Sequence, residues 1–397
     1  MVQEICVFLF SLTALGVLYI MNNVPAFQEP VVILEVGVAV LVAVFILVYA
    51  ATRCDPPKDP LFYVFAEFSF TCIIDLTSAL EYDGFISGFM EFYQKTGEPY
   101  LGTPYATMMC YWDGIVHFII YLMLVHRISN RKQYRTLGLF WSGSLCANMI
   151  VFVPGIVAGK YGSEIRPAFW LNMPFLLVPI WGAVSLFSRP RDVPLMVTYK
   201  AEREQKKALI WRPVDLFFVI YVVAAMGFSL FRGLAVLDCP LEILDRYVIE
   251  YEPYLKDPVG FPKVMMLLML FHALPMLGCF AYGLCTPGCT WTVFFAGAVL
   301  QCQWSHIGAS LHPRTAETYR IPATALPPVL LLNLPYAVGP VLLALRCQRQ
   351  PEYFLSLAPM DSDHTKIVSA VQPPKQRKTT LAHYINRTQR KTHNLTA

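Results

Sequence analysis

The sequence predicts an all-α polytopic membrane protein with about ten transmembrane helices, and three observations lead to this fold class. Of the 397 residues, 56% are hydrophobic and 15% are charged, whereas about a quarter of the residues in soluble proteins are charged. The charged residues cluster between apolar blocks of roughly 17 to 25 residues, the length of helix that crosses a bilayer. Helices are expected because lipid offers the backbone no hydrogen-bond partner.

Ten apolar blocks are expected to form the transmembrane spans. The first block lacks the basic segment and the A-x-A cleavage site of a signal peptide, so we expect a retained anchor. The ninth block is the weakest, because Gln301, Gln303, Ser305 and His306 lie in its second half. In chain order the blocks cover residues 6–21, 31–52, 61–80, 108–126, 137–158, 168–187, 214–237, 263–285, 291–311 and 325–346.

Lysine and arginine are unevenly distributed over the predicted loops. They are frequent in alternate loops, such as the one that carries Arg127, Arg131, Lys132 and Arg135, and sparse in the others. The positive-inside rule therefore predicts that both termini are cytosolic, which an even number of spans allows. The net charge of +4 reflects this bias, and we expect no binding to nucleic acid.

An internal repeat divides the chain. Glu98-Pro-Tyr-Leu101 recurs as Glu252-Pro-Tyr-Leu255, and Asn172-Met-Pro-Phe175 recurs as Asn333-Leu-Pro-Tyr336. Similar offsets between the copies predict one duplicated unit of four spans, with parallel copies and a 2 + 4 + 4 architecture. The expected parts are two N-terminal helices at 1–57, a first four-helix unit at 58–190, a cytosolic linker at 191–213, a second four-helix unit at 214–350 and a disordered cytosolic tail at 351–397.

Two acidic residues inside predicted spans are the main candidates for function, because ionisable groups within a membrane are costly. Asp75 lies in the third span and Asp113 in the fourth, and His117 follows Asp113 by four residues and shares its helix face. Two such carboxyl groups could donate a proton to an alkene and remove one, or hold a cationic amine. Trp112 could offer a π-face to positive charge. The alternative is that the acids form hydrogen bonds between helices or to Arg232.

The second copy of the unit has lost these acids. Alignment of the copies places Arg232 at the position of Asp75 and Leu270 at the position of Asp113. A ligand pocket is therefore expected in the first copy. The chain lacks paired C-x-x-C spacing, a phosphate loop and an H-E-x-x-H motif, and we expect neither a metal nor a cofactor.

A series of short motifs runs through residues 6–350. They are Asp59-Pro-Leu-Phe-Tyr63, Gly97-Glu-Pro-Tyr-Leu101, Cys110-Tyr-Trp-Asp-Gly114, Gly159-Lys-Tyr-Gly162, Arg166-Pro-Ala-Phe169, Leu230-Phe-Arg-Gly-Leu234, Leu237-Asp-Cys-Pro240 and Ser305-His-Ile-Gly-Ala-Ser310. Together these motifs resemble the transmembrane 6 superfamily. Within that family, Ser163-Glu-Ile-Arg-Pro-Ala-Phe169 and Leu176-Leu-Val-Pro179 resemble member 2 more than member 1.

This resemblance implies two EXPERA domains, the module shared with the emopamil-binding sterol isomerase and the sigma-two receptor. It implies a multi-pass protein of the membranes of the endoplasmic reticulum and of the intermediate compartment between it and the Golgi. For member 2 it also implies a role in hepatic triglyceride secretion and in lipid-droplet content. Membrane lipids or a sterol are the implied ligands, and lipoprotein-assembly proteins are implied partners.

The sterol isomerase pattern carries over only in part. Its two membrane acids match Asp75 and Asp113, and its asparagine in the last helix matches Asn172. The isomerase histidine falls on Thr71 and its tryptophan falls on Phe175, so the proton shuttle and the cation-stabilising ring are missing. The sigma-two receptor also has an aspartate at the first acid position, and the pattern therefore fits binding without turnover.

Two hypotheses follow for the function. The first is a lipid- or sterol-binding regulator of neutral-lipid handling and lipoprotein lipidation. The second is a sterol Δ8–Δ7 isomerase with Asp75 and Asp113 as the catalytic acid and base. A transporter, a third reading, is supported by the repeat alone. The expected ligand-binding residues are Asp75, Trp112, Asp113, His117, Asn172 and Phe175.

Overall fold

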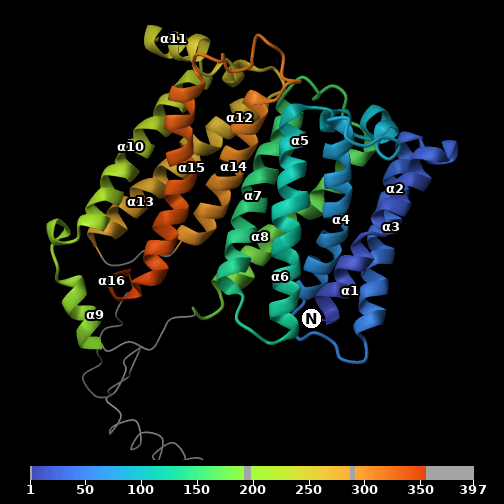
Figure 1. The fold of residues 1–397 in the computed structure, drawn as a ribbon, viewed down its shortest axis with the longest axis horizontal. Coiled ribbons are helices and arrows are strands. Elements are labelled where there is room, and N and C mark those ends of the chain that lie inside the picture. Colours follow the sequence, from blue (N-terminus) through green and yellow to red (C-terminus); the bar gives the residue numbers. More distant parts are fainter. Residues whose placement is uncertain (1, 192–197, 287–290, 355–397) are drawn as a thin grey trace, which may run out of the picture.

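The computed structural model describes residues 2–191, 198–286 and 291–354, and the regular secondary structure of these residues is helical throughout (Figure 1). Nine helices in the described part are long and apolar enough to cross a membrane, which confirms a polytopic membrane protein. They are Gln3–Asn23, Pro30–Thr52, Leu61–Tyr82, Pro104–Ser129, Arg135–Ala158, Pro167–Phe187, Pro213–Val236, Phe261–Cys285 and Leu326–Arg349.

The predicted ninth span forms helix α14, Thr292–Leu311, which is not among these nine. Its second half carries Gln301, Gln303 and His306, and all three side chains are buried against other helices rather than exposed. Helix α14 packs on α7 (Arg135–Ala158), α5 (Pro104–Tyr111) and α15 (Leu326–Arg349). Polar side chains are tolerated there because they face protein and not lipid.

Several spans contain a break. The second helix of each four-helix unit is interrupted by a π-helical turn, η4 at Trp112–His117 and η8 at Met269–Ala273. These turns begin 157 residues apart, the same offset that separates the Met108-Met109 and Met265-Met266 pairs. π-helical turns of this kind are frequent at functional sites. The remaining segments of the broken spans are α1 (Val2–Ser11), α2 (Ala14–Asn23), α6 (Phe118–Ser129), η5 (Pro167–Asn172), α8 (Met173–Phe187), α12 (Phe261–Leu268) and α13 (Leu274–Cys285).

The two four-helix units meet along α7 and α14. A Cβ atom added to Gly143 would lie 1.9 Å from the carbonyl oxygen of Phe294, and one added to Gly297 would lie 2.1 Å from that of Phe140. The two contacts are reciprocal, since 154 residues separate both the glycines and the phenylalanines. The backbones are therefore in direct contact about a local two-fold relation.

The helices before the first unit pack on one side of it. Helix α3, Pro30–Thr52, is mostly exposed, as expected of a lipid-facing helix. The N-terminus lies at the same end of the bundle as α9 (Thr198–Gln205) and α16 (Pro351–Phe354), and α11 (Glu242–Glu250) lies at the other end (Figure 1). The other elements are α4 (Leu61–Tyr82), α10 (Pro213–Val236) and the short turns η1 (Pro25–Phe27), η2 (Tyr93–Gly97), η3 (Pro99–Leu101), η6 (Leu209–Trp211) and η7 (Pro253–Lys256).

The predicted disordered tail needs one correction. Residues 351–354 form α16, because Tyr353 and Phe354 are buried and the ring of Tyr353 lies 3.7 Å below the guanidinium of Arg212. The rest of the tail, residues 355–397, and residues 192–197 of the linker lie outside the described residues.

Candidate functional site

A cavity of about 160 Å³ lies within the first four-helix unit, and its wall is mainly apolar. Helices α4 and α7 of this unit and the N-terminal helices α2 and α3 contribute most of the lining residues, and Met21 and Gly37 are examples from α2 and α3. The N-terminal helices therefore belong to the site, although the sequence placed the pocket within the first unit alone. The polar residues of the wall are Thr71, Asp75, Ser78, Glu98, Asp113 and Asn172, together with the tyrosines Tyr93 and Tyr121.

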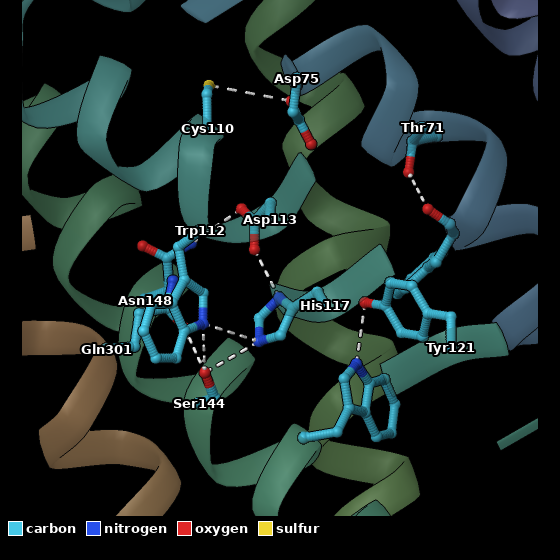
Figure 2. A network of polar contacts seen from close by, with 12 residues as sticks. Thr71, Asp75, Cys110, Trp112, Asp113, His117, Tyr121, Ser144, Asn148 and Gln301 are labelled. Atoms are coloured by element: carbon cyan, nitrogen blue, oxygen red, sulfur yellow. Dashed lines mark hydrogen bonds and ion pairs between the residues drawn. The ribbon is translucent and has the colours of Figure 1, made fainter. Parts of the chain in front are cut away.

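Both membrane acids line this cavity, but each has its own partners (Figure 2). Asp75 of α4 accepts a weak hydrogen bond from the thiol of Cys110, with Sγ and Oδ1 3.9 Å apart. Asp113 lies in η4, with Oδ1 2.5 Å from Nδ1 of His117. Its Oδ2 accepts a hydrogen bond of 3.3 Å from the amide of Asn148 on α7. The two acids share one cavity, and their hydrogen-bond partners Cys110 and Asn148 lie on different helices, α5 and α7.

His117 lies behind Asp113 and not in the cavity wall. Its Nε2 is 2.8 Å from the hydroxyl of Ser144, which donates a hydrogen bond of 2.5 Å to Oε1 of Gln301. Asp113, His117, Ser144 and Gln301 thus form a continuous polar chain from the cavity to helix α14 of the second unit (Figure 2). The i, i+4 spacing of Asp113 and His117 predicted that they share one helix face, and in the structure their side chains are in contact.

Trp112 also lies outside the cavity wall, which corrects the expectation that its ring faces a ligand. The indole Nε1 donates a hydrogen bond of 3.0 Å to the hydroxyl of Ser144, and the ring packs on Trp304 with centroids 5.9 Å apart. The π-helical turn η4 begins at Trp112 and places it between the units. Trp112 therefore orients the Ser144–His117 pair.

Asn172 and Phe175, two of the expected ligand-binding residues, both line the cavity. The ring of Phe175 packs on that of Phe68, with centroids 4.7 Å apart. Thr71 occupies the wall where the isomerase pattern has histidine, and its hydroxyl donates a hydrogen bond of 3.0 Å to the carbonyl oxygen of Phe68 in its own helix. Thr71 therefore offers no proton relay.

Glu98 is a site residue that the sequence reasoning missed. It lies in the loop before α5, and its Oε1 accepts hydrogen bonds of 2.6 Å from the amide of Asn172 and from the hydroxyl of Tyr100. Burial raises the pKa of Glu98 to about 7. The signal was in the sequence, because the glutamate of the repeated Glu-Pro-Tyr-Leu motif and the asparagine of the repeated Asn-x-Pro motif bind one another.

The second unit contains the equivalent asparagine–glutamate hydrogen bond, but there an arginine and a histidine surround it. The amide of Asn333 donates a hydrogen bond of 2.7 Å to Oε1 of Glu252. Nε of Arg232 lies 3.0 Å from Oε2 of Glu252, and its other nitrogens contact Asn333 at 3.1 Å and Nε2 of His306 at 2.5 Å. Burial by itself would raise the pKa of Glu252, but Arg232 and His306 lower it to about 2. This cluster is a compensated buried ion pair.

Packing places Asp75 and Arg232 at equivalent positions along the first helix of their respective units. A Cβ atom on Gly114 would lie 2.5 Å from Cβ of Leu76, and one on Gly233 would lie 2.9 Å from Cβ of Leu270. Leu76 follows Asp75 and packs on Gly114, and Gly233 follows Arg232 and packs on Leu270. Each of these contacts joins the first and second helices of one unit. Within the described residues, no group of three or more histidine, cysteine, aspartate or glutamate side chains could hold a metal ion.

Comparison with known proteins places the chain in a family. A family model described as the transmembrane domain of transmembrane 6 superfamily member 2-like proteins matches residues 13–197. Transmembrane 6 superfamily member 2 of Homo sapiens is 46% identical over 88% of this chain and 94% of its own length. The Mus musculus protein of that name is 45% identical over 89% of this chain and 96% of its own length. No solved structure matches the chain. The chain is therefore a multi-pass membrane protein that belongs to the transmembrane 6 superfamily member 2 family.

Proposed function

We propose that the protein binds a sterol or another lipid in the cavity of its first unit and thereby regulates neutral-lipid handling. The observation that carries this proposal is a mainly apolar cavity whose wall contains two membrane acids and the hydrogen-bonded pair of Glu98 and Asn172. Mostly apolar walls with a few convergent polar groups are typical of ligand sites. The acids and the amide would orient a hydroxyl or amine group on a ligand whose body is hydrocarbon.

The cellular setting is part of the same proposal. A regulator of this kind would act in the membranes of the endoplasmic reticulum and of the compartment between it and the Golgi, with both termini in the cytosol. It would influence the secretion of triglyceride-rich lipoproteins and the content of lipid droplets. The resemblance set out in the sequence analysis and the mainly apolar wall of the cavity support this setting.

A cavity-filling variant tests ligand binding directly. Thr71→Phe places in the wall the residue that the second unit has at the equivalent position, Phe228. We expect at least a tenfold loss of binding of a photoreactive cholesterol analogue to the protein in lipid nanodiscs, because the ring occupies the ligand space. Phe228→Leu in the second unit is the matched control and should bind the probe as the wild type does. Equal labelling of Thr71→Phe and wild type would contradict the proposal.

The link to lipid secretion needs a cellular experiment. Asp75→Asn and Asp113→Asn should lower triglyceride secretion from hepatocyte-like cells in which they replace the wild-type protein. Immunoblotting must show equal amounts of each variant. If both variants secrete triglyceride as the wild type does, the cavity acids are not required for the cellular role.

A sterol Δ8–Δ7 isomerase is the second candidate, and the Asp113–His117–Ser144–Gln301 chain favours it because it connects one acid to further proton-carrying groups. One protonated acid would add a proton to the alkene, and the other carboxylate would remove a proton from the neighbouring carbon of the resulting cation. Purified protein incubated with a Δ8-sterol should then give the Δ7 isomer by mass spectrometry. Absence of product, where a known isomerase is active, would leave binding alone.

A further inference from the structure

A second cavity, of about 320 Å³, lies between the two four-helix units. It is bounded by α7 and α8 of the first unit and by η8, α14 and the last residue of α12, Leu268, of the second. Its wall includes several small residues, among them Gly143, Ala147, Ala183 and Ala298. We call this cavity the interunit crevice. Among the described residues that line it, none carries a hydroxyl, amide or carboxylate group, and His272 is the only histidine.

The local two-fold relation shows why the crevice is open. Ile150 and Met269 line it, and their counterparts in the other copy are Trp304 and Trp112, at the offsets of 154 and 157 residues found above. Those two indole rings pack on one another, with centroids 5.9 Å apart. Nε1 of Trp304 also donates a hydrogen bond of 2.9 Å to the carbonyl oxygen of Met108. The rings of Trp112 and Trp304 thus fill the interface between the units on one side, and the interunit crevice leaves the equivalent space on the other side open.

The depth of the crevice indicates what fills the open side. On α14 the wall runs from Trp291 to Cys302, roughly 16 Å along the helix axis and about half of a hydrocarbon layer of about 30 Å. Trp291 is exposed at the start of α14, where tryptophan is typical of the membrane interface. The guanidinium of Arg135 lies 6.0 Å from the ring centre of Phe187 at the same end. The crevice therefore leads from the level of the lipid headgroups towards the middle of the membrane.

We propose that the interunit crevice binds one acyl chain of a bilayer glycerolipid, at a site distinct from the cavity of the first unit. An apolar cavity of this size stays dry, so hydrocarbon from the surrounding membrane is its natural occupant. The headgroup stays at the interface near Trp291, and the chain runs between α8 and α14. Apart from the imidazole of His272 and the indole of Trp291 at the interface, the described residues of the wall have no side chain that would hydrogen-bond a sterol hydroxyl in the crevice. The bound chain contributes the packing that the tryptophan pair supplies on the other side.

The test uses the full chain in nanodiscs that contain phosphatidylcholine with a diazirine on one acyl chain. After irradiation, peptide mass spectrometry should locate adducts on Val299 and Cys302, which are buried from the outer surface and line the crevice. The double variant Ile150→Trp with Met269→Trp recreates the tryptophan pair and should lower these adducts at least fivefold. Ala183→Phe fills the crevice from α8 and should lower the adducts to the same extent. It replaces the double variant in the test if that variant does not fold. Val223→Trp, at an exposed position of α10 outside the crevice, is the matched control.

The outcomes separate the occupants. Adducts on Val299 and Cys302 that fall in the filled variants but not in Val223→Trp support the acyl chain. Adducts that are equal in all variants overturn the proposal, as does labelling of these residues by a photoreactive sterol but not by the diazirine lipid. Binding of the cholesterol probe in the first cavity should be the same in the filled variants. Failure of either proposal can therefore be recognised without the other.

Discussion

The two four-helix units hold the same glutamate–asparagine pair and surround it with opposite chemistry. In the first unit Glu98 and Asn172 border a cavity that also contains Asp75. In the second unit the equivalent pair, Glu252 and Asn333, is covered by Arg232, whose guanidinium also lies 4.8 Å from the ring centre of Phe228. Two positions account for the difference. The first unit has Asp75 and Thr71 where the second has Arg232 and Phe228, so the first site is open and the second is filled.

The difference teaches how a duplicated membrane unit can divide its roles. A buried carboxylate costs free energy unless a cation or hydrogen bonds compensate it. The second unit provides this compensation internally, and its polar cluster becomes part of the scaffold. The first unit keeps its acids uncompensated by arginine, and a ligand can therefore complete their hydrogen bonds.

The largest expected effect comes from removing the cation of the second unit. Arg232→Met leaves Glu252 charged and buried without its partner, and we expect a loss of about 3–5 kcal/mol in the free energy of unfolding. Asp75→Asn at the equivalent position of the first unit should leave this free energy unchanged or raise it, since the amide has no charge to bury. Unfolding in nanodiscs, followed by tryptophan fluorescence in denaturant, measures both.

A rescue variant sharpens this prediction. Arg232→Met with Glu252→Gln removes both charges, and it should recover most of the stability lost in Arg232→Met. If Arg232→Met is as stable as the wild type, Glu252 is not held by charge compensation, and the contrast between the two units loses its basis.

A smaller effect is expected from pH. The pKa of Glu98, raised by burial to about 7, exceeds the ordinary value of 4.5, so the folded chain retains a proton that the unfolded chain loses. The free energy of unfolding should therefore fall as pH rises from 4.5 to 7, by about 3 kcal/mol in total. The pKa of Glu252, about 2, gives the opposite dependence, since its contribution is present above pH 4.5 and is lost as pH falls towards 2.

Unfolding measured at pH 5, 6, 7 and 8 distinguishes the two glutamates. Glu98→Gln should flatten the dependence in this range. Glu252→Gln should lower stability at every pH and keep the slope. A slope that survives in Glu98→Gln would show that Glu98 is not the group that titrates.

The smallest effect concerns the polar chain between the units. Ser144→Ala removes the hydroxyl that joins His117, Trp112 and Gln301, and we expect a loss of about 2 kcal/mol because buried polar atoms lose their partner. Ser142→Ala, on the same helix, is the matched control, because within the described residues the hydroxyl of Ser142 makes one hydrogen bond, to the carbonyl oxygen of Leu139 in its own helix. Equal stability of the two variants would show that the chain does not couple the units.

Sequence patterns predicted the membrane helices well, since each apolar block has the length of a span and the loops carry the charges. The exception is α14, whose buried glutamines lower its hydropathy although neighbouring helices shield them. Hydropathy cannot distinguish a polar residue that faces protein from one that faces lipid, and this limit explains the difference between ten predicted spans and nine.

The candidate site was predicted in part. Asp75 and Asp113 were found because acids are rare in spans, and Asn172 and Phe175 were found through the resemblance to a known family. Ser144 and Asn148 were not predicted, and Gln301 was noted only as a polar residue of the ninth block, because hydroxyl and amide groups are ordinary in membrane helices. Only the tertiary packing brings them to Asp113 and His117. The direction of Trp112 depends on the π-helical turn, which the local sequence does not reveal.

The reciprocal contacts of Gly143 and Gly297 limit how the molecule can move. Where backbone touches backbone without intervening side chains, the units cannot slide or rock against one another without steric collision. A pump that alternates its access between the two faces of a membrane needs such rocking. A ligand of the first cavity is therefore expected to enter and leave sideways, from the bilayer and past α3, while the rest of the bundle remains a rigid frame.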